Sequence, residues 1–246
     1  MGLQSGMDKF LAIAGLIPAV DWLALLLFFF AWLAYAVFAK RKARFEGSLL
    51  AATNRERRRW MLQVTYRDVR VIDGVVMQNL SSSPSFFAST TILIIGGLLA
   101  MLGASEKASE LVSDLPFAAR TTNLVFDLKL ALLASIFVYA FFRFTWSMRQ
   151  YTFGALLVAA APSAERFISE GLSREDFADR AGRLVGMAAE TFNDGLRAYY
   201  LAFAVIAWFF SPWAFMFSTL GVIYVLYQRE FRSEVLDVLQ ERKSGD

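Results

Sequence analysis

The chain has 246 residues, of which 57% are hydrophobic, and 24 of them are phenylalanines. This apolar share is above that of an ordinary soluble domain and indicates a membrane protein. The chain has no cysteine and no histidine, which excludes disulfides, thiolate or imidazole metal sites, cysteine nucleophiles and Ser-His-Asp triads. A formal net charge of +3 does not predict nucleic-acid binding, because basic residues beside apolar segments usually determine membrane topology.

The first apolar segment, residues 20–39, is long enough to cross the membrane, since about 20 apolar residues span the hydrocarbon core. The basic sequence KRKAR, residues 40–44, follows it directly. A cleavable signal peptide would have a shorter apolar core and a small-residue cleavage site after it. We therefore expect a first membrane span that the mature protein keeps.

Residues 40–84 form the first predicted cytoplasmic segment. The apolar residues Trp60, Val64, Val71 and Val75 recur near helical spacing between polar faces, which predicts an amphipathic helix over residues 56–80. Anionic lipid is a possible partner of the basic sequences KRKAR and RERRR in this segment.

The second predicted span covers residues 85–103. Gly96, Ala100 and Ala104 repeat at every fourth position around its end. Such a face of small residues is typical of close helix packing in membranes. Its partner is either a neighbouring span or a second protomer.

The third predicted span, residues 124–142, contains Asp127 and Lys129 near its start. Two residues apart on a helix, these side chains point about 200° from each other and need separate partners. Asn123 lies one turn before Asp127 and could join it in a polar cluster. Either the two charges form part of an ion or solute pathway, or they are structural and Lys129 reaches the membrane surface along its aliphatic stem.

Arg143, Trp146 and Arg149 follow at the inner edge of this span. Aromatic rings and arginines in such a place are typical of an interfacial anchor. Alternatively, Arg143 pairs with Asp68 or Asp73 of the first cytoplasmic segment. Arg70 and Asp73 have the spacing of a pair within one helix.

The second predicted cytoplasmic segment, residues 143–197, opens helices at PSAE (162–165) and at SRED (173–176), where Ser173 has the position of an N-cap residue. The chain then continues into a fourth apolar block, residues 198–227. Pro212 interrupts this block, so it is either one long tilted span or a hairpin that turns at residues 211–213 with arms of about 15 residues, about 22 Å long.

Basic residues determine the predicted orientation. Ten Lys or Arg lie in residues 40–84 and seven in residues 143–197, whereas residues 104–123 contain two. By the positive-inside rule the two basic segments are cytoplasmic and the N-terminus is outside. Four basic residues after the fourth block favour the hairpin, which returns the C-terminus to the cytoplasm.

The sequence therefore predicts an all-α, polytopic transmembrane bundle of four or five spans with amphipathic cytoplasmic helices, as a single integral membrane domain over residues 1–246. Phosphate-binding glycine motifs are absent, and the cytoplasmic segments are too short for an independent catalytic domain. We expect no enzyme activity, no cofactor and no metal.

Five sequences, in this order along the chain, resemble the landmarks of the domain of unknown function 599 family: FFASTTILIIGGL, FRFTWSMRQY, NDGLRAYYLA, SPWAFM and YQREFRS. The resemblance runs from about Asp21 to Ser233. It implies a polytopic integral membrane protein of the kind found in bacteria and plants. It implies no activity and therefore no catalytic or binding residues, but it directs attention to Arg143, Trp146, Arg149, Asn193, Arg197, Trp213, Arg229 and Glu230.

Two functions remain open for a protein of this kind in a bacterial inner membrane. The first is a small transporter or channel-like protein, which the charges of the third span and the break at Pro212 favour. The second is a scaffold or assembly subunit that binds another membrane protein through the Gly96 face or the basic first segment. Either form could act as a homo-oligomer.

Overall fold

The computed structural model describes residues 17–42, 47–113 and 122–241, and all regular elements within these ranges are α-helices. The predicted all-α class is therefore confirmed. In chain order the helices are α2 (Ala19–Lys42), α3 (Leu49–Val64), α4 (Val71–Gly103), α5 (Ser105–Ser113), α6 (Asn123–Ala159), α7 (Ala164–Ser169), α8 (Arg174–Ala207), α9 (Pro212–Phe231) and α10 (Glu234–Glu241). Within the described ranges, α2, α4 and α6 are long and apolar enough to cross a membrane.

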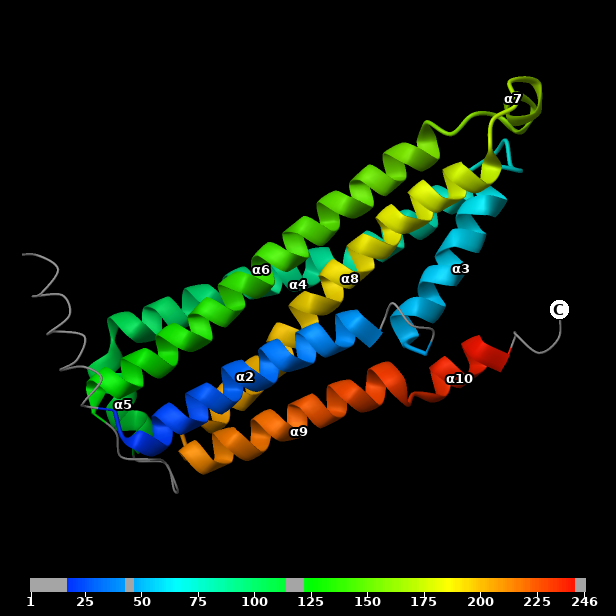
Figure 1. Cartoon of the computed structure of the whole chain (residues 1–246). Coiled ribbons are helices and arrows are strands. Elements are labelled where there is room, and N and C mark those ends of the chain that lie inside the picture. The colour runs from blue at the N-terminus through cyan, green and yellow to red at the C-terminus, as the bar shows by residue number, and fades with distance from the viewer. Residues whose placement is uncertain (1–16, 43–46, 114–121, 242–246) are drawn as a thin grey trace, which may run out of the picture.

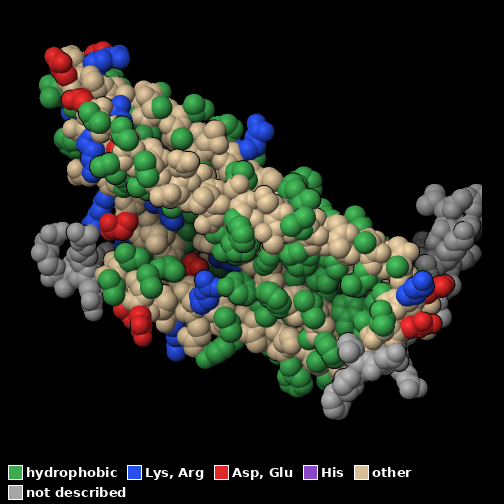
Figure 2. Space-filling model, turned by 180° about the vertical axis from the view of Figure 1, so that it is seen from behind, with side chains coloured by type: hydrophobic (Ala, Val, Ile, Leu, Met, Phe, Trp, Pro, Cys, Tyr) green, Lys and Arg blue, Asp and Glu red, His purple; other side chains and the backbone are tan. Residues whose placement is uncertain are grey.

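The three longest helices, α4, α6 and α8, run side by side along the length of the molecule (Figure 1). Helices α2 and α9 lie beside one half of them, and we call this half the bundle (residues 19–42, 85–103, 123–143 and 194–231). The other half, which we call the extension (residues 49–84 and 144–193), includes α3 and carries α7 at its tip. On the face in Figure 2, hydrophobic side chains gather over the half that ends at α5, whereas most charged side chains lie over the other half.

The long helices pass through the predicted ends of the spans. Helix α4 begins well before residue 85, α6 continues to Ala159, and α8 enters the fourth apolar block without a break. Helix α6 has 37 residues, which corresponds to about 56 Å. It is therefore longer than the hydrocarbon core, about 30 Å, and the extension is a continuation of the bundle helices.

The single helix predicted over residues 56–80 is wrong. Helix α3 ends at Val64, and α4 begins at Val71 after a reversal of the chain. Two side-chain hydrogen bonds stabilise this reversal. Trp60 Nε1 donates to Asp73 Oδ1 at 2.7 Å, and Arg70 donates to the carbonyl of Val64 at 3.3 Å. The helical spacing of the apolar residues therefore belonged to two successive helices. Residues 43 and 44 of KRKAR lie outside the described residues.

The predicted helix starts after Pro162 and at Ser173 are confirmed. The Ser163 hydroxyl accepts a hydrogen bond from the backbone N–H of Arg166, and the Ser173 hydroxyl accepts one from Asp176 at 3.0 Å. Each hydroxyl satisfies an N–H group that has no partner within its own helix.

The fourth apolar block contains a break at the predicted place. Helix α8 ends at Ala207, α9 begins at Pro212, and the Ser211 hydroxyl accepts from the N–H of Trp213 at 3.1 Å. Proline suits the first turn of a helix because its missing N–H would be unpaired there. The predicted length of the two arms is wrong, since α9 has 20 residues and α8 has 34.

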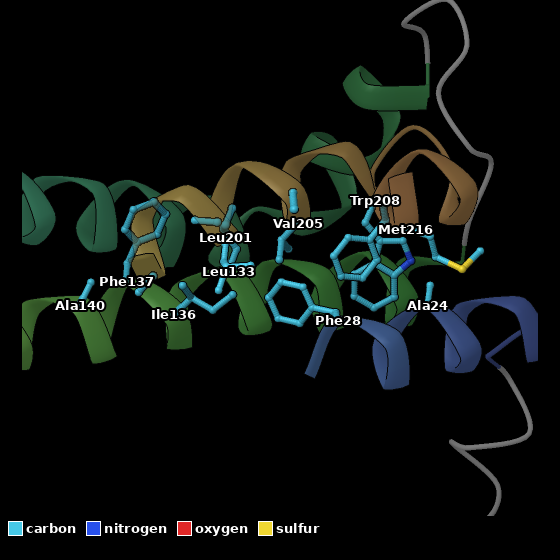
Figure 3. Packing of buried hydrophobic residues seen from close by; sticks show 14 of the residues in the cluster. Ala24, Phe28, Leu133, Ile136, Phe137, Ala140, Leu201, Val205, Trp208 and Met216 are labelled. Atoms are coloured by element: carbon cyan, nitrogen blue, oxygen red, sulfur yellow. The ribbon is translucent and has the colours of Figure 1, made fainter. Parts of the chain in front are cut away.

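Aromatic and branched side chains fill the centre of the bundle (Figure 3). Phe28 of α2, Ile136 of α6, Val205 of α8 and Phe215 of α9 all belong to this buried cluster. The rings of Trp208 and Phe215 stack with 5.2 Å between their centroids. Such packing supplies dispersion contacts whether water or lipid surrounds the bundle.

The close helix contacts lie at glycines other than Gly96. A Cβ atom added at Gly195 of α8 would lie 2.5 Å from the ring of Phe144 on α6, and one at Gly182 would lie 3.0 Å from the backbone of Arg58 on α3. A Cβ at Gly96 would meet nothing within 4 Å, and Ala100 and Ala104 are exposed. Among the described residues, no neighbouring span covers the predicted packing face, which corrects that alternative.

We expect Gly195→Leu to destabilise the fold by about 2 kcal/mol or more, because the new side chain overpacks the Phe144 contact. The matched substitution Gly96→Leu adds the same side chain to an open helix face and should change stability by less than about 0.5 kcal/mol. Thermal unfolding of the purified variants in one detergent, followed by circular dichroism, measures both. Equal melting temperatures for the two variants would contradict the assigned helix contact.

Candidate functional site

A buried carboxylate on α8 forms ion pairs with basic side chains from three helices of the bundle. Asp194 is 8% exposed, and its Oδ1 accepts a hydrogen bond from Arg197 Nη1 at 3.1 Å. Its Oδ2 accepts from Arg143 of α6 and lies 3.9 Å from the ammonium of Lys40 on α2. Asp194 therefore joins α2, α6 and α8 electrostatically.

Glu230 extends this arrangement to α9 and α3. One of its carboxylate oxygens accepts from the backbone N–H of Leu50 at 3.3 Å, and the other lies 3.9 Å from Arg197 Nη2. The Leu50 N–H belongs to the first turn of α3, where N–H groups lack helical partners and favour an anion. Arg197 thus bridges two carboxylates, and its guanidinium lies 5.7 Å from the ring centroid of Tyr35.

We call Lys40, Arg143, Asp194, Arg197 and Glu230 the inner ionic cluster. The helices position these groups simply: Asp194 and Arg197 are one turn apart on α8, and Lys40 lies in the last turn of α2. Three cations face two carboxylates, so the cluster carries excess positive charge. The Nε atom of Arg143 is buried without a hydrogen-bond partner, so the described groups do not satisfy every donor.

A small cavity of about 90 Å³ lies beside the cluster. Arg229 at its wall donates a hydrogen bond to the Tyr200 hydroxyl. The polar side chains that line it are Tyr35, Asn193, Arg197, Tyr200, Arg229 and Glu230. The cavity can hold a few water molecules or a small ionised group, and both charge signs are available for its recognition.

A second set of polar groups lies toward the other end of the bundle. Lys129 of α6 is 1% exposed, and its ammonium donates to the backbone carbonyl of Trp208 at 2.9 Å. The indole of Trp208 donates in turn to the carboxylate of Asp21 on α2. We call Asp21, Lys129 and Trp208 the outer polar cluster.

Lys129 therefore caps the C-terminal end of α8. Trp208 is the C-cap residue of that helix, and its carbonyl belongs to a helix end that favours a cation. The prediction that Lys129 reaches the membrane surface along its stem is wrong, because the side chain is buried between helices. Its predicted need for a partner other than Asp127 is confirmed.

The predicted cluster of Asn123 with Asp127 does not form within the described residues. Asn123 is exposed, and Asp127 Oδ1 is buried without a hydrogen-bond partner. Asp127 therefore lies on the same helix as Lys129 but is not a member of the outer polar cluster.

The acidic residues Asp68 and Asp73 of the first predicted cytoplasmic segment lie in the extension and do not contact Arg143. Asp73 accepts from Arg67 at 2.9 Å, and Asp68 accepts from the backbone N–H of Ala164 at 3.0 Å. Arg70 donates to the carbonyls of Ala161 and Pro162. The predicted pairs of Arg143 with Asp68 or Asp73, and of Arg70 with Asp73, are therefore wrong.

Of the other predicted residues at the inner edge, Asn193 lines the small cavity, whereas Trp146 and Arg149 are exposed. The interfacial role of Trp146 and Arg149 stays a prediction.

Sequence reasoning missed Asp194, although the motif NDGLRAYYLA contains it three residues before Arg197. That spacing signalled an acid and a base on one helix face. The contributions of Lys40 and Tyr35 needed the arrangement of α2 against α8.

Distances along α6 relate the two clusters to the thickness of a membrane. Arg143 follows Lys129 by 14 residues, which corresponds to about 21 Å of helix. The hydrocarbon core is about 30 Å thick. If α6 crosses a membrane close to its normal, at least one of these buried charges must lie within the hydrocarbon.

Within the described ranges, no group of three or more acidic side chains is placed to hold a metal ion.

The sequence model of a family described as "Protein of unknown function, DUF599" matches residues 23–235. No curated protein and no solved structure matches the chain.

We expect Asp194→Asn to lower the stability of the bundle by about 3 kcal/mol or more, because it leaves buried arginines without their counter-charge. Asp176→Asn on the same helix is the matched control. Asp176 is exposed, so its substitution should change stability by less than about 1 kcal/mol. Thermal unfolding in detergent tests both variants, and equal melting temperatures for them would show that Asp194 does not hold the helices together.

Proposed function

This chain belongs to the DUF599 family of proteins of unknown function, and from the geometry of its polar clusters we propose that it transports a small charged solute. The membrane in question is the bacterial inner membrane. The protein crosses it five times, with the N-terminus outside and the C-terminus in the cytoplasm.

Helix packing and charge support the five crossings. Helices α2, α4 and α6 have the length and apolar character of membrane spans. The end of α8 packs against α6, and α9 packs against α2 and α8, so that residues of all four helices share the buried aromatic core. Helix α9 ends with Arg229 in its last turn, and the basic end of α2 lies beside it, with the Lys42 ammonium 4.5 Å from the ring centroid of Phe231. This agrees with a cytoplasmic location of both ends.

The observation that carries the proposal is the inner ionic cluster. Charged groups within a membrane bundle are costly and usually mark an ion or substrate pathway. Here five charged side chains from four helices meet beside a cavity that Arg197, Arg229 and Glu230 line. A solute with an acidic group would compete with Glu230 for Arg197. Its binding would therefore loosen the link between α8 and α9.

The conformation described is closed between this cavity and the outer end of the bundle. The rings of Phe28, Trp208 and Phe215 pack together there, with centroids 5.1 Å apart for Phe28 and Phe215. Transport requires α8 and α9 to move relative to α2, because these rings block the path. The short turn at residues 208–211 joins the two helices that would have to move.

The scaffold function is the second candidate, and one observation favours it. The half of α4 near α5 exposes Ile92, Leu93 and Leu99 beside the open Gly96 face. Exposed apolar surface of this kind is covered by lipid or by another membrane protein. The scaffold function predicts a partner that remains bound in mild detergent and no solute movement.

The transport proposal is tested by counterflow in proteoliposomes. The purified protein is reconstituted, and uptake is measured for radiolabelled inorganic phosphate, acetate, glutamate and lysine, each against an internal excess of the same solute. We expect saturable uptake of at least one of these solutes. Glu230→Gln should lower the solute concentration that gives half-maximal uptake by about tenfold, because it removes the carboxylate that competes with an acidic solute for Arg197.

Glu234→Gln is the matched control, since Glu234 lies exposed in α10 and has the same side chain. It should leave this half-maximal concentration unchanged. If uptake of all four solutes is no greater than in protein-free liposomes, the transport proposal is contradicted and the scaffold function is favoured. Equal half-maximal concentrations for both variants would show that solute movement does not use the inner ionic cluster.

A further inference from the structure

A lateral groove of about 580 Å³ lies between α2 and α6. Its walls are almost wholly apolar, and the hydroxyl of Ser135 is already bonded to the carbonyl of Ala131 at 2.7 Å. The residues that line it are Phe29, Trp32, Leu33 and Ala36 from α2, and Leu132, Ser135, Ile136 and Tyr139 from α6. Phe29 and Leu33 are exposed at its edge, so the groove opens to the side of the bundle.

The two walls run in the same direction. Near one end, Asp21 of α2 and Lys129 of α6 both contact Trp208. Near the other end, Lys40 of α2 and Arg143 of α6 both contact Asp194. Helices α2 and α6 are therefore parallel neighbours along the whole groove.

Each wall is a stripe with the same helical spacing, and each stripe continues to a basic residue. Lys40 follows Ala36 by four residues, and Arg143 follows Tyr139 by four. Residues four apart lie on one face of a helix. The apolar groove therefore has a cation on each wall one turn beyond its inner end.

The length of the groove matches one leaflet of a membrane. From Phe29 to Lys40 is 11 residues, about 16 Å of helix. Half of the hydrocarbon core is about 15 Å. A lipid with one acyl chain in the groove and its headgroup at Lys40 and Arg143 would match this length. Its apolar chain would face the apolar walls, and its charged headgroup would face the two cations.

The cations at the inner end have capacity for an additional anion. The side chain of Lys40 is 54% exposed, and its ammonium lies 3.9 Å from the Asp194 carboxylate, which is a long ion pair. The Nε of Arg143 lacks a hydrogen-bond partner. The inner ionic cluster also has more cations than carboxylates, which favours a phosphate group over a neutral or cationic occupant.

We propose that this groove is a binding site for one anionic phospholipid of the inner leaflet. One of its two acyl chains lies between α2 and α6, and the phosphate contacts Lys40 and Arg143. The site rests on the proposed membrane crossing of α2 and α6 but not on transport. Failure of the counterflow experiment therefore leaves it intact, and failure of lipid binding leaves the transport proposal intact.

Native mass spectrometry of the detergent-purified protein tests the site. The protein is titrated with phosphatidylglycerol or phosphatidylethanolamine of equal chain length, and bound lipids are counted. We expect one phosphatidylglycerol to bind at least about tenfold more tightly than phosphatidylethanolamine. Lys40→Gln should remove most of this preference, whereas Arg41→Gln, an adjacent exposed basic residue of α2, should keep it.

Ala36→Trp tests the groove itself, because its side chain fills the space that the acyl chain would occupy. It should reduce binding of phosphatidylglycerol at least about fivefold. Leu26→Trp adds the same ring at an exposed position of α2 outside the groove and should have no effect. A protein dimer that Ala36→Trp dissociates would assign the groove to a second copy and overturn the proposal.

Trp32 gives an independent readout that does not depend on the folding of the groove variant. Its ring lies 5.8 Å from that of Tyr139 at the groove wall. Phosphatidylglycerol with brominated acyl chains should quench the fluorescence of the protein, and Trp32→Phe should remove that part of the quenching. Equal quenching with brominated phosphatidylethanolamine, or no loss of quenching in Trp32→Phe, would overturn the proposal.

Discussion

The bundle depends on one buried carboxylate. Asp194 pairs with Arg143 and Arg197 and lies 3.9 Å from Lys40, so a single side chain of α8 links this helix to α6 and, more weakly, to α2. Removing the Asp194 carboxylate would leave buried arginines without their counter-charge, which is why this position should tolerate little change. The same network reaches α9 through Glu230. Apolar packing fills the space between these helices, and the ion pairs add a directional constraint, because the burial of apolar surface is itself non-directional.

The opposite end of the bundle obeys a related constraint. Helix α8 stops at Ala207, and the end of that helix would leave carbonyl groups unpaired in an apolar environment. The ammonium of Lys129 donates a hydrogen bond to the carbonyl of Trp208 at this helix end, and the indole of Trp208 donates to the carboxylate of Asp21. Two polar clusters therefore lie at the two ends of an aromatic core. They carry the transport proposal and mark the ends of the groove that we propose binds lipid.

The local features of the chain could be predicted from the sequence, whereas contacts between distant segments could not. Apolar length gave the positions of α2, α4 and α6, and proline chemistry gave the break at Pro212. The positions of Ser163 and Ser173 gave two helix starts. Helical periodicity could not show that residues 65–70 reverse the chain, because two successive helices can share one pattern. Nor could it place Arg143 beside Asp194, because that contact depends on how α6 packs against α8. The small-residue spacing singled out Gly96 as a packing position, whereas the close helix contact lies at Gly195, which no such spacing marked.

We propose that α8 and α9 form a membrane-crossing hairpin with the inner ionic cluster near its cytoplasmic side. The chain has no cysteine, so single cysteines can report the side of the membrane with a membrane-impermeant maleimide. In intact bacterial cells the account predicts that Trp213→Cys, at the exposed start of α9, is labelled. It predicts that Val238→Cys, exposed on α10, is labelled only after the membrane is permeabilised. Labelling of Val238→Cys in intact cells would contradict the account, because α9 would then not return the chain to the cytoplasm.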